Sequence, residues 1–533
     1  MEVDCIPFKE TGYFSKLICD YLDQRKDLQP FYKRFPLPEN FAEQIKEKEA
    51  NYAFAHRATL VQSLHKQYKG ITISEHTEAN LTALNAKNTF TVVTGHQLNL
   101  FTGPLYFLYK IVSTINLTKE LGRLYPDHQF VPVYWMATED HDFDEINYFN
   151  LNGKKVQWNR SASGAVGMLD TKGLDVVFET VSAELGKTGN AESLKALFKQ
   201  AYLEHSNLTE ATRYLVNELF GEHGLVIVDG DDIALKRLLV PYAEKDIFEQ
   251  IPFQKVTESI GALEQVSPDY KVQVNPREIN YFYLKEGLRE RIVEEGGTYQ
   301  VLNTDLKFSE QELREELYAH PERFSPNVIA RPLYQEVILP NLTYIGGGGE
   351  LAYWLELKSY FNAMDITFPM LLLRNSALVI TEKQAEKIER LNLKVAHLFL
   401  KQNTFINKKI REISNIDIDF SPQKKYLEEQ FKHLYELAAE TDKSFLGAVK
   451  AQEVKQKKGL DALEKRLLKA QKRKLKDQVI RMTDIQNELF PNKSLQERQL
   501  NFSELYLELG KGLIPSLLDS LDPFSGAFSI LKY

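Results

Sequence analysis

Short, almost continuous apolar runs recur in the first part of the chain and alternate with stretches of helical periodicity. Five of them are TFTVV at 89–93, FVPVYWM at 130–136, GLVIV at 224–228, LTYI at 342–345 and ITFPMLLL at 366–373. Runs that lack polar alternation are typical of strands buried on both faces. Because these runs alternate with helical segments, the pattern predicts an α/β fold with a parallel-sheet core.

Polar or glycine-rich residues come at or soon after the end of each predicted strand. In chain order these segments are TGHQ, EDHDFDE, DGDD and GGGGE, and the fifth run is followed by Arg374 and Asn375. Ligands of open α/β sheets bind at the carboxyl ends of the strands, near the point where the strand order reverses. We therefore expect TGHQ, EDHDFDE, DGDD and GGGGE to converge on one cleft.

The remaining segments suggest a division into three regions. We predict a core at 1–375, whose first 85 residues are mostly helical and which carries insertions at approximately 160–220 and 240–340. Within the second insertion, NYFYL and TYQVL suggest strands. Residues 376–490 should form a helical coiled-coil domain, and residues 491–533 a segment that packs back on the core.

The expected coiled-coil domain rests on periodicity. Residues 377–413 and 423–490 predict two long helices, broken near IDIDFSP. A seven-residue interval typical of a coiled-coil seam joins four apolar positions, namely Leu468, Leu475, Met482 and Leu489. The other faces around KQKKGLDALEKRLLKAQKRKLK are strongly basic, which is typical of a solvated coiled-coil face. Nucleic-acid binding is disfavoured because almost no aromatic side chain is available there for stacking.

Composition narrows the function classes. The chain has 533 residues, 43% of them hydrophobic, and a formal net charge of −8, which disfavours a general nucleic-acid binder. Two cysteines, Cys5 and Cys19, form no disulfide framework, and the beginning of the chain does not resemble a signal peptide. No apolar stretch approaches the length of about 20 residues that a membrane helix needs. A cytoplasmic protein with no membrane segment is expected.

The TGHQLNLFTGP segment is the first candidate site. The backbone of a glycine-rich turn before a helix can hold a phosphate or carboxylate, and His96 can stabilise charge or move a proton. A tight strand-to-helix turn with a hydrogen-bonded histidine explains the same residues equally well. The candidates in this segment are Gly95, His96, Gln97, Thr102 and Gly103.

The acidic segment EDHDFDE is the second candidate. It can be read as a Mg²⁺ or Mn²⁺ site, as a set that binds an amine and accepts its proton, or as a solvated turn. An abrupt acidic segment so soon after an apolar strand favours function, and we prefer the amine reading to a permanent metal. The candidates are Glu139, Asp140, His141, Asp142 and Asp144.

The NLTYIGGGGELAYW segment is the third candidate. Successive glycines let the backbone approach a ligand closely, and a carboxylate after them suits an amine. The preceding RPLYQE places an arginine and a glutamine at helical spacing, which suits a carboxylate or phosphate clamp. The candidates are Gly346, Gly347, Gly348, Gly349, Glu350, Trp354, Arg331 and Gln335. No GxxxxGK[ST], strand-linked GxGxxG or HExxH motif is present.

Four long segments together resemble one known family. TGHQLNLFTGPLYFLYKI, PVYWMATEDHDFDEIN, FSPNVIARPLYQEVILPNLTYIGGGGELAYW and SLQERQLNF resemble the bacillithiol biosynthesis cysteine-adding enzymes in order and spacing, over nearly the whole chain. The resemblance implies a Rossmann-like core related to class I nucleotidyl-transferring enzymes, with inserted connecting-peptide regions and a helical coiled coil that supports a homodimer.

The resemblance also implies an activity. Cysteine would be joined to the glucosamine amine of glucosaminyl-malate to form bacillithiol, with ADP or ATP as a possible ligand. The family often has Gln at the place of His96, so His96 is expected to supply a hydrogen bond, not to act as an obligatory base.

Under this ligase reading, three aspartates of the acidic segment would orient and deprotonate the amine, and Arg331 with the glycine turn would hold malate or phosphate charge. One alternative is a metal-dependent nucleotidyltransferase or phosphohydrolase that uses EDHDFDE. Another is an adaptor that acts through its coiled coil.

Overall fold

The computed structural model describes residues 1–533 and divides into two compact units. One unit, the core, comprises Met1–Val379 and Leu495–Leu531. The other, the helical unit, comprises Ile380–Ser494 with the last two residues. None of the helices combines the length and the apolar character that crossing a membrane requires.

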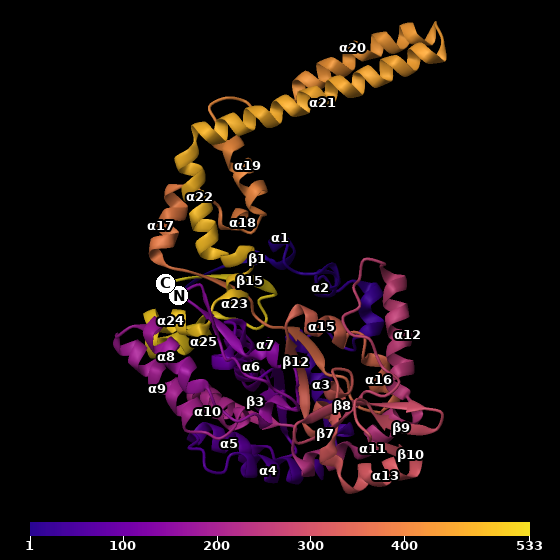
Figure 1. The fold of residues 1–533 in the computed structure, drawn as a ribbon, viewed down its shortest axis with the longest axis vertical. Helices are drawn as coiled ribbons and strands as arrows, with labels where there is room; N and C mark the ends of the chain where they lie inside the picture. Colours follow the sequence, from indigo (N-terminus) through magenta and orange to yellow (C-terminus); the bar gives the residue numbers. More distant parts are fainter. The chain divides into compact units, whose positions relative to one another are not determined.

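A five-stranded parallel sheet lies at the centre of the core (Figure 1). Its spatial order is β13-β12-β2-β3-β6, and every neighbouring pair is parallel. The bounds are β2 Thr89–His96, β3 Gln129–Met136, β6 Val226–Asp229, β12 Asn341–Gly346 and β13 Met370–Leu373. The predicted α/β class and all five predicted strands are confirmed.

The strand order reverses beside β2. From β2 the chain builds outward through β3 to β6, and later it adds β12 and β13 on the other side of β2. The loops that leave β2 and β12 therefore diverge, and the space between them is the position where doubly wound sheets bind ligands.

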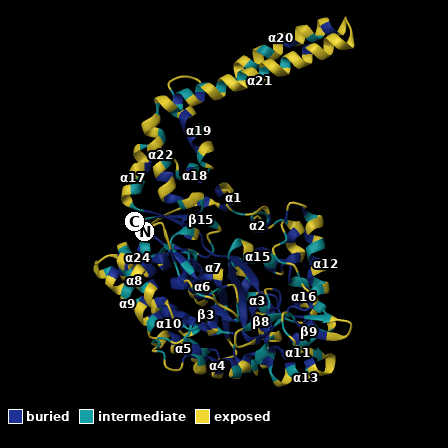
Figure 2. Cartoon of the chain, viewed as in Figure 1, coloured by how far each residue is buried: buried dark blue, intermediate teal, exposed yellow.

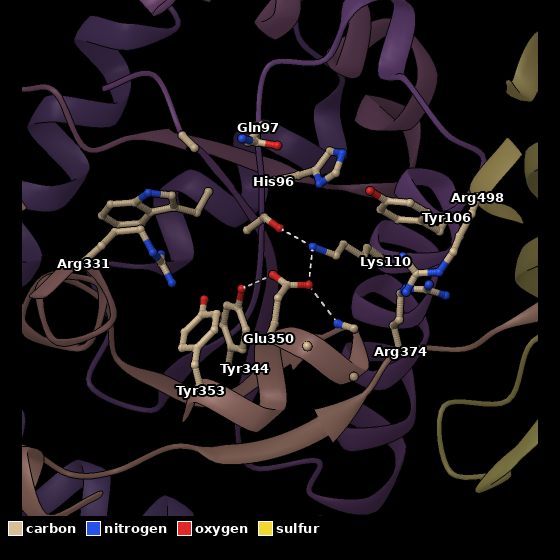
Figure 3. Close-up of a pocket in the computed structure, with 16 residues that line it drawn as sticks. His96, Gln97, Tyr106, Lys110, Arg331, Tyr344, Glu350, Tyr353, Arg374 and Arg498 are labelled. Atoms are coloured by element: carbon tan, nitrogen blue, oxygen red, sulfur yellow. Dashed lines mark hydrogen bonds and ion pairs between the residues drawn. The ribbon is translucent and has the colours of Figure 1, made fainter. Parts of the chain in front are cut away.

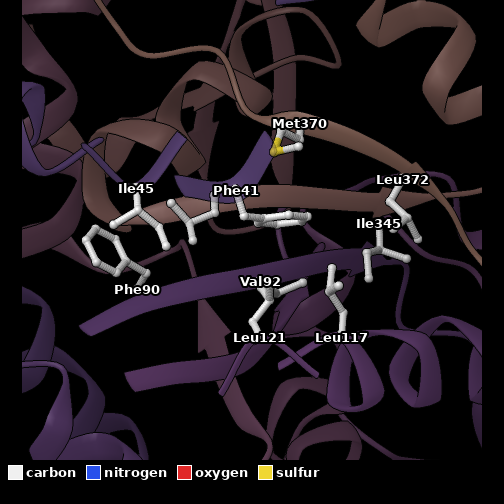
Figure 4. Close-up of a cluster of buried hydrophobic side chains, with 10 residues drawn as sticks. Phe41, Ile45, Phe90, Val92, Leu117, Leu121, Ile345, Met370 and Leu372 are labelled. Atoms are coloured by element: carbon white, nitrogen blue, oxygen red, sulfur yellow. The ribbon is translucent and has the colours of Figure 1, made fainter. Parts of the chain in front are cut away.

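Side chains from distant segments fill the space next to the sheet (Figure 4). Phe41 and Ile45 of α3 (Phe41–Asn51), with Leu117 of α6 (Tyr106–Leu124), belong to one buried cluster with strand residues that include Val92 and Ile345. Most residues of these strands are buried and dark in Figure 2, because both faces of the sheet are covered. This burial explains why the strands appear as unbroken apolar runs in the sequence.

Helices and short strands complete the core. Before the sheet come β1 Glu2–Pro7, α1 Phe8–Thr11, α2 Lys16–Leu22, α4 His56–Gln67 and α5 Glu75–Ala83. Between β3 and β6 come α7 Phe143–Ile146, β4 Tyr148–Leu151, β5 Lys154–Gln157, α8 Leu174–Leu185, α9 Gly189–Leu203 and α10 Leu208–Phe220. Around β12 and β13 lie α14 Ala330–Ile338, α15 Gly348–Trp354, α16 Lys358–Ala363 and β14 Ala377–Ile380. The C-terminal segment forms α23 Gln496–Gln499, α24 Phe502–Leu509, α25 Leu513–Ser520 and β15 Ala527–Lys532.

The segment between β6 and β12 contains a second, antiparallel sheet in the order β10-β9-β8-β7-β11. Its strands are β7 Tyr281–Lys285, β8 Leu288–Glu295, β9 Thr298–Val301, β10 Lys307–Ser309 and β11 Phe324–Pro326. Its helices are α11 Ile233–Glu249, α12 Ile251–Val266 and α13 Glu310–Ala319. The strands expected at NYFYL and TYQVL are β7 and β9, so this prediction is confirmed.

The helical unit consists of α17 Glu382–Arg390, α18 Val395–Leu398, α19 Gln402–Ile413, α20 Ser421–Ala439, α21 Lys443–Lys474 and α22 Lys476–Leu489. The prediction of two long helices is wrong. Asn392 has a positive φ, Asp442 starts α21 as its N-cap, and Leu475 leaves the helical conformation between α21 and α22. Helices α20 and α21 form a hairpin closed by Phe431, Ala438 and Val449, and most of its surface is exposed (Figure 2).

A buried carboxylate fastens the antiparallel sheet to the core. Asp246 of α11 is fully buried, and its Oδ1 accepts a 2.9 Å hydrogen bond from the backbone N–H of Asn280, next to β7. Its Oδ2 has no partner, and burial raises the pKa of Asp246 to about 7 although the Asn280 hydrogen bonds lower it. The Asn280 carbonyl in turn accepts a 2.9 Å hydrogen bond from the backbone N–H of Asn327.

Replacing Asp246 by Asn should remove part of the pH dependence of stability. The raised pKa means that the folded state binds this proton more tightly than the unfolded state, so stability falls as pH rises from about 4 to about 7. Between about pH 5 and pH 8, this carboxyl should lower the free energy of unfolding of the native chain by ~3 kcal/mol. Asp246→Asn should lack this contribution. Urea unfolding at both pH values measures it, with the exposed Asp175→Asn as control. Equal pH dependence in all three proteins would contradict this assignment.

Candidate functional site

A cavity of about 350 Å³ opens at the reversal point of the sheet (Figure 3). The end of β2 contributes Gly95, His96 and Gln97, and the turn after β12 contributes Gly347 to Glu350. The other lining residues are Tyr106, Lys110, Trp135, Ala137, Arg331, Tyr344, Tyr353, Arg374 and Arg498. The predicted convergence is therefore observed for the TGHQ and GGGGE segments, with Arg374 beside them, whereas no residue of the DGDD segment at 229–232 lines the cavity.

The cavity wall carries an excess of positive charge. Lys110, Arg331, Arg374 and Arg498 line it, whereas Glu350 is the one carboxylate among the lining residues. Arg374 is also paired with the buried Glu497 at 2.7 Å, while Arg498 is exposed and has no carboxylate partner. Such a wall favours an anionic ligand.

Glu350 is saturated by its neighbours. Its carboxylate pairs with Lys110 Nζ at 2.6 Å, and it accepts hydrogen bonds from the Tyr344 hydroxyl at 2.7 Å and the Gly347 backbone N–H at 2.8 Å. Burial alone raises the pKa of Glu350, but the Lys110 charge and these hydrogen bonds outweigh it and lower the pKa overall. Lys110 also donates to the Gly95 carbonyl at 2.7 Å, so the pair joins the β2 and β12 ends.

His96 is neutral at physiological pH. Burial, together with the charges of Lys110 and Arg374, holds the pKa of His96 well below its usual range. Its ring packs against Tyr106 and Phe107, and its buried Nε2 has no hydrogen-bond partner. A neutral imidazole beside two cations can donate or accept one hydrogen bond at its unpaired nitrogen.

Two arginines reach the cavity with unpaired nitrogens. Arg331 donates from Nη1 to Gln335 at 3.2 Å and lies near the rings of Trp135 and Tyr344, but its buried Nη2 has no partner. Its position is set by Asn327, whose carbonyl accepts from the Arg331 backbone N–H and whose side chain caps the start of α14. The Nε of Arg374 is likewise buried without a partner.

The acidic segment lies beside the cavity, not in its wall. Gln97 connects the two, because its Nε2 donates to Asp140 Oδ2 at 2.7 Å and to Glu145 Oε2 at 2.8 Å. Glu139 pairs with the buried Lys236 at 2.6 Å, and His141 Nδ1 is 2.6 Å from Arg289 Nη1.

The other aspartates of the segment face solvent. Asp142 and Asp144 are exposed, and neither lines the cavity. No group of three or more His, Cys, Asp or Glu residues is arranged to hold a metal ion. The structure therefore brings the acidic segment to the edge of the cavity but does not bring its carboxylates into the wall.

Several predicted residues support the cavity from behind. Gln335 accepts a hydrogen bond from Arg331, and the ring centroids of Trp354 and Tyr344 are 4.6 Å apart. The Gly346 carbonyl accepts a hydrogen bond from the Arg374 backbone N–H at 2.9 Å. Thr102 and Gly103 are buried in the next turn, where the Gly103 carbonyl accepts a hydrogen bond from Asn501. These five residues do not line the cavity.

Sequence reasoning missed Lys110, Tyr106, Arg498 and the role of Arg374 in the cavity wall. Lys110 carried a usable signal, because it is a single cation within the apolar run YFLYKIVSTINL, and such a lysine needs a buried partner. Arg374 directly follows a predicted strand, as the other site segments do. Arg498 comes from a segment far along the chain, and no local pattern placed it near the sheet.

Comparisons with known proteins identify relatives over the whole chain. Residues 1–375 match the family model described as bacillithiol biosynthesis BshC, N-terminal Rossmann-like domain, and residues 377–533 match the BshC C-terminal coiled-coil domain. A protein of Christiangramia forsetii named "Putative cysteine ligase BshC" is 59% identical over 100% of this chain and 99% of its own. A protein of the same name from Flavobacterium johnsoniae is 58% identical over 100% of both chains. Another, from Cytophaga hutchinsonii, is 39% identical over 98% of this chain and 97% of its own.

Proposed function

This chain belongs to the BshC family of bacillithiol biosynthesis proteins, and we propose that it is a ligase that joins the carboxyl group of cysteine to an amine. The proposed amine substrate is glucosaminyl-malate, and the product is bacillithiol, which would make this the last step of the pathway. The names of its relatives support the ligase class, and the cavity supports an anionic substrate.

The observation that carries the proposal is a set of unpaired nitrogens in the cavity wall. Arg331 Nη2, Arg374 Nε and His96 Nε2 are buried and have no hydrogen-bond partner in the protein. An unpaired buried polar atom costs free energy, about 1–3 kcal/mol for each neutral group, so such atoms are retained where a ligand completes them. Carboxylate or phosphate oxygens would accept from both arginines.

Glucosaminyl-malate has the charge distribution that this wall requires. Its malate carboxylates would lie on the side of Arg331, Arg374 and the glycine turn at Gly347–Gly349. Glu350 and Glu497 pair with Lys110 and Arg374, which leaves Arg331 and Arg498 as cations without a carboxylate partner. Its amine would lie toward Gln97, on the side of the acidic segment. Rate enhancement would come mainly from position and charge.

Amide formation from a carboxylate also needs activation, which ATP can supply as an adenylate or an acyl phosphate. The same arginines suit the phosphates of ATP or ADP, so a nucleotide fits the donor set of the cavity. A cytoplasmic location agrees with the use of ATP.

A metal-dependent nucleotidyltransferase or phosphohydrolase is not favoured. Asp140 uses Oδ2 for Gln97 and Oδ1 for the backbone N–H groups of His141 and Asp142, and Glu139 is paired with Lys236. Carboxylates with these partners do not form a set of ligands for a divalent cation.

We further propose that the chain forms a homodimer through the α20–α21 hairpin. Exposed apolar side chains on the hairpin support this proposal. Tyr426 and Leu463 line one hollow between α20 and α21, and Leu437 is exposed further along α20. Exposed apolar side chains that gather on one surface mark interaction sites. Sedimentation of the native chain and of Leu463→Glu tests it, with a dimer expected for the first and a weaker one for the second. A native monomer at micromolar concentration would contradict it.

The ligase proposal predicts a product that mass spectrometry can detect. The purified chain, incubated with glucosaminyl-malate, cysteine and ATP, should form bacillithiol. AMP with pyrophosphate would indicate adenylation of cysteine, whereas ADP with phosphate would indicate an acyl phosphate. If no amide product forms with ATP or any other nucleoside triphosphate, the proposed function is wrong.

Arg331→Met should impair the reaction specifically. Methionine keeps an apolar side chain near Trp135 and Tyr344 but removes the charge that faces the malate group, so kcat/KM should fall by about 100-fold. Arg237→Met is the matched control, because Arg237 is exposed on α11 and makes no ion pair. Similar values of kcat/KM for the two variants would remove Arg331 from the proposed site.

A further inference from the structure

Gln97 is held in one orientation by two carboxylates. Both hydrogens of its amide nitrogen are used, one toward Asp140 Oδ2 at 2.7 Å and one toward Glu145 Oε2 at 2.8 Å. If the amide were turned over, its oxygen would face two carboxylate oxygens with no hydrogen between them. The charge-assisted bonds therefore fix which end of the amide is the oxygen.

The fixed orientation leaves the Gln97 oxygen available to a ligand. Gln97 lines the cavity, and Figure 3 draws its amide oxygen on the side of His96 with the nitrogen turned away. That oxygen accepts no hydrogen bond from the protein, whereas the Glu350 carboxylate and the Gly95 carbonyl are both occupied by Lys110. In a wall rich in donors, Gln97 thus presents an unused acceptor.

Asp140 is committed on both of its oxygens. Oδ2 accepts from Gln97, and Oδ1 accepts from the backbone N–H groups of His141 at 2.7 Å and Asp142 at 3.3 Å. Neither Asp140 nor Glu145 lines the cavity. Their negative charge reaches the cavity through the amide that they orient.

The chemistry of an attacking amine favours an amide oxygen as its partner. A carboxylate in contact with the amine stabilises the ammonium form, which raises the amine pKa and removes the lone pair needed for attack. A neutral amide oxygen accepts an N–H from the uncharged amine with a smaller bias toward the ammonium form. An acceptor of this kind suits a site that must keep the amine reactive.

We propose that the Gln97 side-chain oxygen binds the attacking amine of the substrate, and that Asp140 and Glu145 are positioning residues that hold this amide. The assignment rests on the proposed ligase function and refines it. The acidic segment then serves the amine indirectly, with Gln97 as the group that touches substrate.

A mutational cycle tests this role. Gln97→Met should raise KM for glucosaminyl-malate on the order of tenfold and leave KM for cysteine unchanged. The double variant Asp140→Asn with Glu145→Gln should show the same selective rise, because its neutral side chains no longer fix the amide. The triple variant should stay within about twofold of Gln97→Met, since residues that act through one group are not additive.

The outcomes separate the two proposals. If the native chain forms the amide but the triple variant has a KM for glucosaminyl-malate far above that of Gln97→Met, the carboxylates act on the amine themselves and the Gln97 assignment is wrong. An equal rise in both KM values would likewise overturn it, since that pattern marks a general structural role. A native chain that forms no amide would instead refute the ligase function. Thermal unfolding checks that every variant is folded, with Asp175→Asn as the control substitution. If Gln97→Met does not fold, the double variant tests the same role.

Discussion

The ion pair between Lys110 and Glu350 is the interaction on which the site depends. It lies where the strand order of the sheet reverses, so that the chain leaving β2 and the chain leaving β12 diverge. Lys110 bonds to the end of β2 through the Gly95 carbonyl, and Glu350 bonds to the glycine turn through the Gly347 N–H. Because both charges are largely removed from water, each needs the other, and removal of either partner would leave an uncompensated charge. One pair in the cavity wall therefore joins the end of β2 to the glycine turn after β12.

That pair also determines the electrostatics of the cavity. It neutralises Glu350, so the remaining arginines give the wall a net positive charge. Burial, with the positive charges of Lys110 and Arg374, lowers the pKa of His96 well below its usual range. Glu350 is consequently not available to bind an amine, although the sequence had suggested that it would bind one. The proposed acceptor for such a group is Gln97, whose amide is oriented by Asp140 and Glu145. Under the proposed function, the anion-binding and amine-binding groups would be separated within one cavity, which suits a substrate that carries both groups.

The sequence predicted the fold well where local patterns carry the information. Five apolar runs predicted five buried strands, since a strand covered on both faces has no polar alternation. The polar segments after TFTVV and LTYI were correctly expected to meet, because parallel strands end at one edge of a sheet. The prediction of two long helices was wrong. The breaks at Asn392 and Asp442 fall outside the seven-residue spacing, and Leu475 breaks the helix at one of its apolar positions without interrupting the pattern. Met482, one of the predicted seam residues, is buried within the helical unit. One turn further along α22, Gln486 donates a hydrogen bond to the Leu398 carbonyl of the same unit.

The sequence by itself determined the class of fold, two of the segments that line the cavity and the family, because these depend on order and spacing along the chain. Tertiary structure alone decided which other side chains line the cavity. Arg498 enters the cavity from a segment near the end of the chain, and Lys110 comes from within a helix that looks apolar. Asp142 and Asp144 look catalytic in the sequence, yet the turn that Asp140 organises directs them to solvent. The physical reason is that charge must be paired wherever it is buried, and the identity of each partner is settled only when distant segments come together.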